Sequence, residues 1–150
     1  MDFTLSPEQL QLQDGATRFM RAHSPFDAWR AQVASGAPFS RENWARMAEL
    51  GWLGINIGED DGGLGGTPFD TMALMLALGG GLSREPFVSA CVIAPAILRH
   101  APEAMRRALL PAIAQGKALV ALALAEEAGH FDFAHVTTRA APPRSPRRWA

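Results

Sequence analysis

Apolar residues recur every three or four positions through most of the chain, in short segments separated by glycine, proline and helix-capping residues. This spacing places the apolar side chains on one face of a helix. Six short helices are therefore predicted. They run from Pro7 to about Arg21, from Phe26 to near Gly36, from Arg41 to Leu50, from Pro68 to Leu78, from Phe87 to about Arg99, and from Glu103 to a break at Pro111.

Capping residues support several of these boundaries. Ser6, Pro7 and Gln9 have the spacing of a capping box, and Ser40 and Thr67 are good N-cap residues. Pro95 lies inside the fifth segment, where it is expected to bend or divide the helix because its ring removes a backbone donor.

A glycine-rich loop over residues 62–66 separates the third and fourth helices. Its glycines can adopt positive φ, and Leu64 between them is expected to be tucked into the core. The loop lacks the spacing of a phosphate-binding loop, and the acidic residues 59–61 before it lack the spacing of an EF-hand. A structural turn is therefore favoured.

The pattern changes after the sixth helix. Residues 118–125 are apolar throughout, which is typical of a buried strand or a short helix. The last eleven residues contain three prolines and no apolar periodicity, and disorder is predicted for them.

The order of these segments resembles the N-terminal helical domain of the acyl-CoA dehydrogenases. The resemblance rests on A-E-L-G-W-L-G before an acidic G-G-L-G-G loop, on M-D-F-T-L-S-P-E-Q at the start, and on Leu109-Leu110-Pro111 followed by I-A-Q-G. The run A-L-G-x-G-L-x-x-E-P-F over residues 77–87 is most similar to bacterial members that act on pimeloyl-, aromatic- or steroid-type acyl-CoA, in which a small subunit pairs with another.

The resemblance implies an all-α bundle of about six helices over residues 1–117. It also implies the start of a β-strand near residues 118–125, within the first part of a middle β domain over residues 118–138, and a disordered tail over residues 139–150. This comparison favours the strand over the short helix for residues 118–125.

The family oxidises acyl-CoA thioesters at the α and β carbons with FAD. Its catalytic glutamate lies in a C-terminal helical domain, so no catalytic residue is assigned here. The resemblance implies flavin contacts from the backbone of Leu124 and Ala125. The wall of the acyl pocket would include Phe131, Met75, Leu78 and Phe87, the last within the Glu85-Pro86-Phe87 segment.

The motif that follows residues 118–124 departs from the family pattern. Ala125 stands where the family has threonine and Phe131 where it has serine, whereas Glu126 and Asp132 match. The hydroxyl groups are therefore missing, and a plain core strand between domains is favoured over a working flavin site. A metal site at His130, Asp132 and His135 with Glu126 and Glu127 is less favoured than a solvated polar turn.

Composition narrows the function classes. Hydrophobic residues make up 48% and charged residues 19%, and 14 basic against 15 acidic residues give a net charge of −1. These values indicate a globular protein without a basic nucleic-acid surface. No signal peptide and no apolar run of about 20 residues is present. A cytoplasmic location without membrane insertion is expected.

The single cysteine, Cys91, lies in an apolar segment and is predicted to be a buried small hydrophobe rather than a nucleophile. Arginine is concentrated after Asp132. A tail rich in alanine, proline and arginine is what a frameshift in GC-rich DNA yields, so a truncated member of the family is expected.

The sequence is consistent with two alternative functions. The chain is either a dehydrogenase-like flavoprotein fragment that is inactive alone, or a non-catalytic helical module that pairs with a full-length dehydrogenase subunit. In both cases an exposed apolar face is expected, and with it a homo- or hetero-oligomer.

Overall fold

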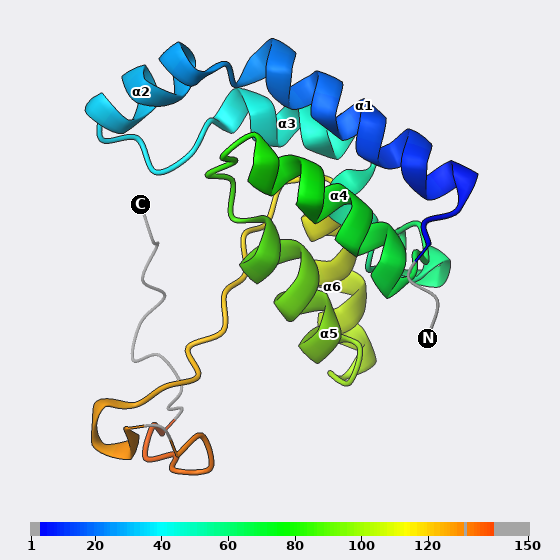
Figure 1. Ribbon diagram of the computed structural model, residues 1–150. Coiled ribbons are helices and arrows are strands. Elements are labelled where there is room, and N and C mark those ends of the chain that lie inside the picture. The colour runs from blue at the N-terminus through cyan, green and yellow to red at the C-terminus, as the bar shows by residue number, and fades with distance from the viewer. Residues whose placement is uncertain (1–3, 131, 140–150) are drawn as a thin grey trace.

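The computed structural model describes residues 4–130 and 132–139 of the chain, and within these ranges it is an all-α fold without strands (Figure 1). The all-α class and the helical bundle are as predicted. The helices are α1 (Pro7–His23), α2 (Phe26–Ala34), α3 (Arg41–Glu49), α4 (Pro68–Gly80), a π-helix (Val88–Ile93) that continues into α5 (Ala94–Leu98), and α6 (Glu103–Ala114). Short 3-10 turns cover Trp52–Gly54, Glu59–Asp61 and Glu127–Gly129.

Helices α1 and α4 lie side by side and run in the same direction. Each begins with a capping box, Ser6 with Gln9 in α1 and Thr67 with Asp70 in α4. The two boxes also contact each other, because Gln9 Nε2 donates a hydrogen bond of 3.0 Å to Asp70 Oδ1. The first box was predicted from the sequence, and the bond between the two boxes aligns the helix starts.

The core lies where α1, α3, α4, the π-helix and α6 meet. Phe19 packs edge-on against Trp52, with ring centroids 5.1 Å apart. Trp44 Nε1 donates a hydrogen bond of 3.2 Å to the carbonyl of Gly116, which joins α3 to the end of α6. The largest fully buried side chains belong to Met47, Leu53, Ile57, Leu74, Leu110, Ile113 and Cys91.

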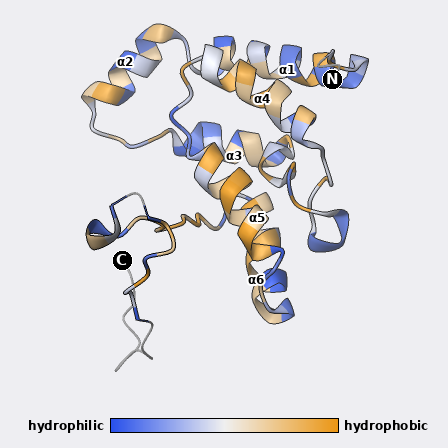
Figure 2. Cartoon of the chain, turned by 60° about the horizontal axis from the view of Figure 1, so that its bottom comes forward, coloured by the Kyte–Doolittle hydropathy of each residue, from blue (hydrophilic) through white to orange (hydrophobic). Residues whose placement is uncertain are grey.

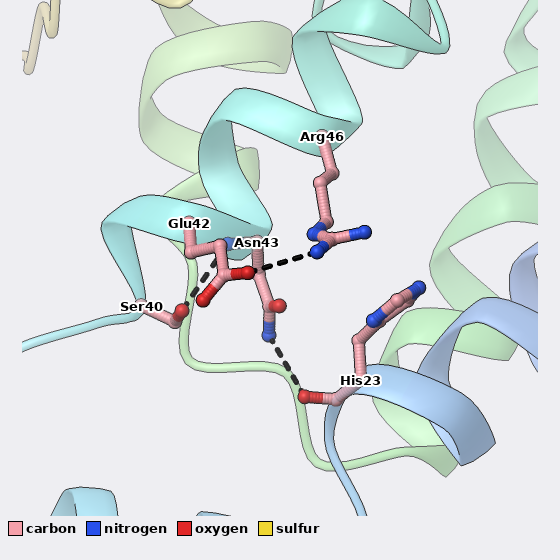
Figure 3. Close-up of polar contacts among 5 residues, drawn as sticks. All are labelled: His23, Ser40, Glu42, Asn43 and Arg46. Carbon is pink, nitrogen blue, oxygen red and sulfur yellow. Dashed lines mark hydrogen bonds and ion pairs between the residues drawn. The ribbon is translucent and has the colours of Figure 1, made fainter.

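A polar contact at the start of α3 joins it to the end of α1 (Figure 3). The Ser40 side chain accepts a hydrogen bond of 3.1 Å from the backbone N–H of Asn43 and so caps α3. Asn43 is buried, and its Nδ2 donates to the carbonyl of His23 at 3.4 Å. Glu42 and Arg46 form an exposed ion pair one turn apart. Asn43 therefore has a structural role at the junction of α1 and α3.

The glycine-rich loop folds back on residues 54–58. The N–H groups of Gly63, Leu64, Gly65 and Gly66 donate to carbonyls of that segment at 2.8–3.0 Å. These donors are consumed within the protein, which supports the structural turn over an anion site. The expectation that Leu64 enters the core is wrong: its side chain is 56% exposed, because the loop packs through its backbone.

Helix α6 ends later than predicted. Pro111 lies inside the helix, which continues to Ala114 before Gly116 ends it at a φ of 69°. The neighbouring Leu110 and Ile113 are buried. Their packing outweighs the one backbone hydrogen bond that a proline removes.

Helix α2 lies at the edge of the bundle and contributes no buried residue (Figure 1). It has no side-chain cap, and Phe26 and Val33 are exposed. A cavity of about 590 Å³ lies between α2 and the ends of α1 and α4.

The strand predicted over residues 118–125 is not formed. These residues have no regular secondary structure, and the chain after α6 leads away from the bundle (Figure 1). A strand needs a neighbour for its ladder of hydrogen bonds, and none lies beside it in the described part of the chain. The tail predicted to be disordered lies outside the described residues, apart from Arg139. No helix among the described residues is long and apolar enough to cross a membrane.

The fold of the glycine-rich loop predicts opposite outcomes for two glycine substitutions. A Cβ at Gly63 would lie 2.1 Å from the carbonyl oxygen of Ile57, whereas a Cβ at Gly58 would have no atom within 4 Å. Gly58 has a φ of −63°, which any residue adopts. Gly63→Ala is expected to lower the free energy of unfolding by about 1–3 kcal/mol. Gly58→Ala should leave it unchanged or raise it by about 0.4–1 kcal/mol. Urea denaturation followed by circular dichroism measures both, and equal stability of the two variants would refute this description of the loop.

The exposure of α2 predicts low local stability. Its backbone amides are expected to exchange with solvent on the order of a hundredfold faster than those in the middle of α1 and α4, because few buried contacts oppose its opening. Hydrogen exchange followed by NMR tests this directly. Equal protection of α2 and α4 would show that a contact absent from the structure holds α2.

Candidate functional site

A cavity of about 150 Å³ lies between α4 and the start of the π-helix. Three of the four residues predicted to line an acyl pocket, Met75, Leu78 and Phe87, come together around it. The fourth, Phe131, lies outside the described residues. The complete lining is Met75, Leu78, Gly79, Ser83, Glu85, Phe87 and Val88. Periodicity placed these residues on two helices, and only the family resemblance indicated that they share a pocket.

The inner wall of the cavity is made of buried side chains, and its rim is made of partly exposed ones. Leu78 and Phe87 are buried, with Phe87 only 3% exposed. Met75 and Val88 on the rim are partly exposed. An apolar ligand could therefore enter from the rim and lie against the aromatic ring.

Pro95 leaves a backbone carbonyl of the π-helix that carries Val88 without its usual helical partner. In a regular helix the N–H of residue 95 would bond to the carbonyl of Cys91, but proline has no N–H. Asn56 Nδ2 instead donates a hydrogen bond of 3.0 Å to the Cys91 carbonyl. Asn56 Oδ1 accepts a hydrogen bond of 2.7 Å from the hydroxyl of Thr71 on α4. This chain of contacts ties the π-helix to α4. The helix is not divided at Pro95: it changes from π-helix to α-helix at Ala94, directly before the proline, and continues to Leu98.

The inner edge of the cavity holds a buried acidic residue. Glu85 is 8% exposed, and Ser83 Oγ donates a short hydrogen bond to its Oε2. The sequence indicated the segment Glu85–Phe87 as pocket wall by resemblance but not that its carboxylate would be buried there. A buried carboxyl group beside an apolar wall is unusual in proteins.

Leu124 and Ala125, the predicted flavin contacts, do not line this cavity. They belong to the segment that leaves the bundle, both are exposed, and Ala125 has no side-chain hydrogen-bonding group. The carboxylate of the next residue, Glu126, is occupied by Thr137 and Thr138. The described residues therefore do not fit a flavin without a further surface, and the role of Leu124 and Ala125 stays a prediction.

Glu126 closes a loop near the end of the described chain. Its carboxylate accepts hydrogen bonds from the N–H of Thr137 at 2.7 Å and of Thr138 at 2.9 Å, and from the Thr137 hydroxyl. These bonds, the Thr137 side chain first, lower the pKa of Glu126 to about 2. In the described part of the chain, no group of three histidine, cysteine or acidic residues could hold a metal ion.

Cys91 is buried, as predicted. Burial raises the pKa of its thiol to about 12. A thiol with this pKa is almost entirely protonated at neutral pH and is therefore a poor nucleophile.

Exposed large apolar side chains are found on α4, the π-helix and α5, and on the segment that follows α6. In Figure 2 the ribbon of α5 is mostly hydrophobic in colour, whereas the ribbon of α1 mixes hydrophilic and hydrophobic colours. We use the name apolar flank for the exposed side chains of Met75, Leu76, Val88, Ile93, Ile97, Leu119, Leu122 and Leu124. Isolated exposed apolar residues are normal in proteins, whereas several on adjoining helices are typical of an interaction surface.

Comparison with known proteins gives consistent matches. Residues 6–117 match the family model of the acyl-CoA dehydrogenase N-terminal domain. The chain is 30% identical over 142 residues to acryloyl-CoA reductase (NADH) of Anaerotignum propionicum, covering 93% of this chain and 36% of that protein. It is 30% identical over 116 residues to the mitochondrial long-chain specific acyl-CoA dehydrogenase of Sus scrofa, covering 73% and 26%.

Two solved structures share the fold. A variant of the steroid ACAD Tcur3481–Tcur3483 superposes with a TM-score of 0.73 at 28% identity, covering 83% of this chain and 34% of that one. The ChsE4–ChsE5 complex from Mycobacterium tuberculosis superposes with a TM-score of 0.78 at 25% identity, covering 86% and 36%. The chain thus spans about a third of the length of these solved relatives.

The Glu126 loop predicts a defined response to acid. Because the folded pKa of about 2 lies below the ordinary value of 4.5, the loop is stabilised above pH 4.5 and loses that stabilisation as the pH falls towards 2. The amide resonances of Thr137 and Thr138 should therefore stay constant from pH 7 to about 4.5 and shift below it. Glu126→Gln should remove this titration, while Glu127→Gln serves as the control. A midpoint near 4.5 in the unmodified chain would contradict the assigned hydrogen bonds.

Proposed function

Because this chain belongs to the acyl-CoA dehydrogenase family, as an N-terminal domain, we propose that it forms the helical wall of a flavin-dependent acyl-CoA-oxidising site. The observation that carries the proposal is the cavity between α4 and the π-helix. It gathers Met75, Leu78 and Phe87, and it opens onto the apolar flank. The substrate types suggested by residues 77–87, namely pimeloyl-, aromatic- or steroid-type acyl-CoA, belong to this proposal.

In the reaction, a base removes the α-proton of the thioester and FAD accepts the β-hydride. The residues of this chain would do neither. Phe87 and Leu78 would hold the acyl group, and Met75 at the rim would exclude water from it once a second surface closes over the cavity. The segment with Leu124 and Ala125 would reach its flavin-contacting position when it pairs with that surface.

The second surface would be a β-rich flavin domain with a catalytic helical domain, carried by a partner subunit or by further sequence. In this proposal residues 1–117 are the helical domain, residues 118–138 begin the β domain, and residues 139–150 are a tail. The apolar flank supports it, since the flank covers the elements that form the cavity and continues into the segment after α6. One of the solved relatives is itself a complex of two different chains, which is consistent with a hetero-oligomer.

A second function is a helical module that pairs with a complete dehydrogenase subunit without taking part in catalysis. The observation that favours it is the poor fit of the described residues to FAD, because Ala125 has no hydroxyl and Glu126 is already bonded. Both functions use the apolar flank, but they differ in whether flavin is bound at the contact.

The test is co-expression of this chain with the flavin and C-terminal domains of one of the solved relatives, followed by purification on a tag carried by this chain. The proposal predicts a yellow complex with the absorbance of oxidised flavin. Ile97→Glu on the flank should reduce recovery of the complex at least tenfold, because burying an unpaired carboxylate is costly. Leu10→Glu on α1, equally exposed but outside the flank, is the matched control.

The outcomes separate the two functions. A flavin-containing complex that depends on Ile97 supports the catalytic wall. A stable colourless complex supports the helical module. The absence of any complex, or a complex that Ile97→Glu and Leu10→Glu weaken equally, would refute the use of the flank in both.

A further inference from the structure

The buried carboxylate of Glu85 gives the cavity a chemical preference that its apolar walls would not have. Oε2 of Glu85 accepts from Ser83 Oγ, while Oε1 has no hydrogen-bond partner among the described residues. Oε1 is not fully buried, so it faces open space. Because Glu85 is 8% exposed and lines the cavity, we take that space to be the cavity.

In the described part of the chain, no basic side chain forms an ion pair with this carboxylate. Its neighbour Arg84 forms no ion pair with it, and the three ion pairs found lie elsewhere. A carboxylate with a free oxygen accepts hydrogen bonds from O–H or N–H groups and repels other carboxylates. A ligand that enters the cavity therefore meets an acceptor beside the ring of Phe87.

We propose that Glu85 is a specificity-determining residue that selects an apolar acyl group bearing a hydroxyl group and rejects one that ends in a carboxylate. The ligand hydroxyl would donate to Glu85 Oε1, and its apolar body would lie against Leu78 and Phe87. Of the substrate types considered above, the inference disfavours the pimeloyl type, whose distal carboxylate would meet Glu85. It favours hydroxylated ring systems.

The inference rests on the proposed function in one respect, since that function places an acyl group in the cavity. Its test needs no flavin and no partner. A cavity of about 150 Å³ matches a single six-membered ring. Phenol and benzoate are therefore suitable probes, with the same ring and either a donor or a carboxylate as substituent.

The experiment titrates each probe into the full chain labelled with ¹³C at the methionine methyl groups. Met75 lines the cavity and reports binding there; its resonance is assigned with Met75→Leu. Phenol is expected to shift the Met75 signal with an affinity about tenfold above that of benzoate, the ratio that one hydrogen bond to a charged group supplies. Glu85→Gln should reduce the ratio to about threefold or less, because an amide accepts and donates without charge repulsion.

Glu49→Gln is the matched control, because it removes one exposed carboxylate outside the cavity and should leave the ratio unchanged. The comparison of phenol with benzoate on the unmodified chain stands even if Glu85→Gln fails to fold. Equal binding of the two probes, or no Met75 shift with either, would overturn the inference. A preference for phenol without any flavin complex would support the role of Glu85 and count against the proposed function alone.

Discussion

The close packing of α4 against α1 determines the position of the candidate-site residues that α4 carries. The two helices are held at their starts by the bond between Gln9 and Asp70. At the other end, Gly81 lies against Met20, where an added Cβ would be 2.5 Å from the Met20 Cβ. Because both ends are fixed, α4 has one position relative to the bundle. The cavity residues Met75 and Leu78 are placed by that position.

The bundle is well packed inside and leaves large apolar side chains exposed outside. Its core and its capping boxes have the features of an independent domain, yet the apolar flank is left uncovered on the same elements that form the cavity. These two facts are consistent if the cavity is one half of a site and the flank is the contact with the other half. The buried carboxylate of Glu85 then has a function as well as a cost, because a closed cavity would strengthen any hydrogen bond that it makes.

Features set by residues close together in the sequence were predicted correctly, whereas features set by long-range contacts were not. The caps at Ser6, Ser40 and Thr67 were identified because capping involves residues three positions apart. Pro111 was interpreted as a break because the packing of its neighbours cannot be read from local sequence. The apolar run over residues 118–125 was consistent with a strand or a short helix, and the family comparison favoured the strand; a strand, however, forms only with a neighbour. The cavity depends on contacts across the fold, such as Asn56 with Cys91, and family resemblance rather than periodicity indicated its residues.

The most direct test of this account is the association state of the isolated chain, measured by sedimentation velocity over a hundredfold range of concentration. An uncovered apolar flank predicts self-association that increases with concentration and is abolished by Val88→Lys together with Ile97→Lys, two substitutions on exposed positions of the flank. A dilution-independent monomer for the unmodified chain would contradict the claim that the bundle is built to be covered.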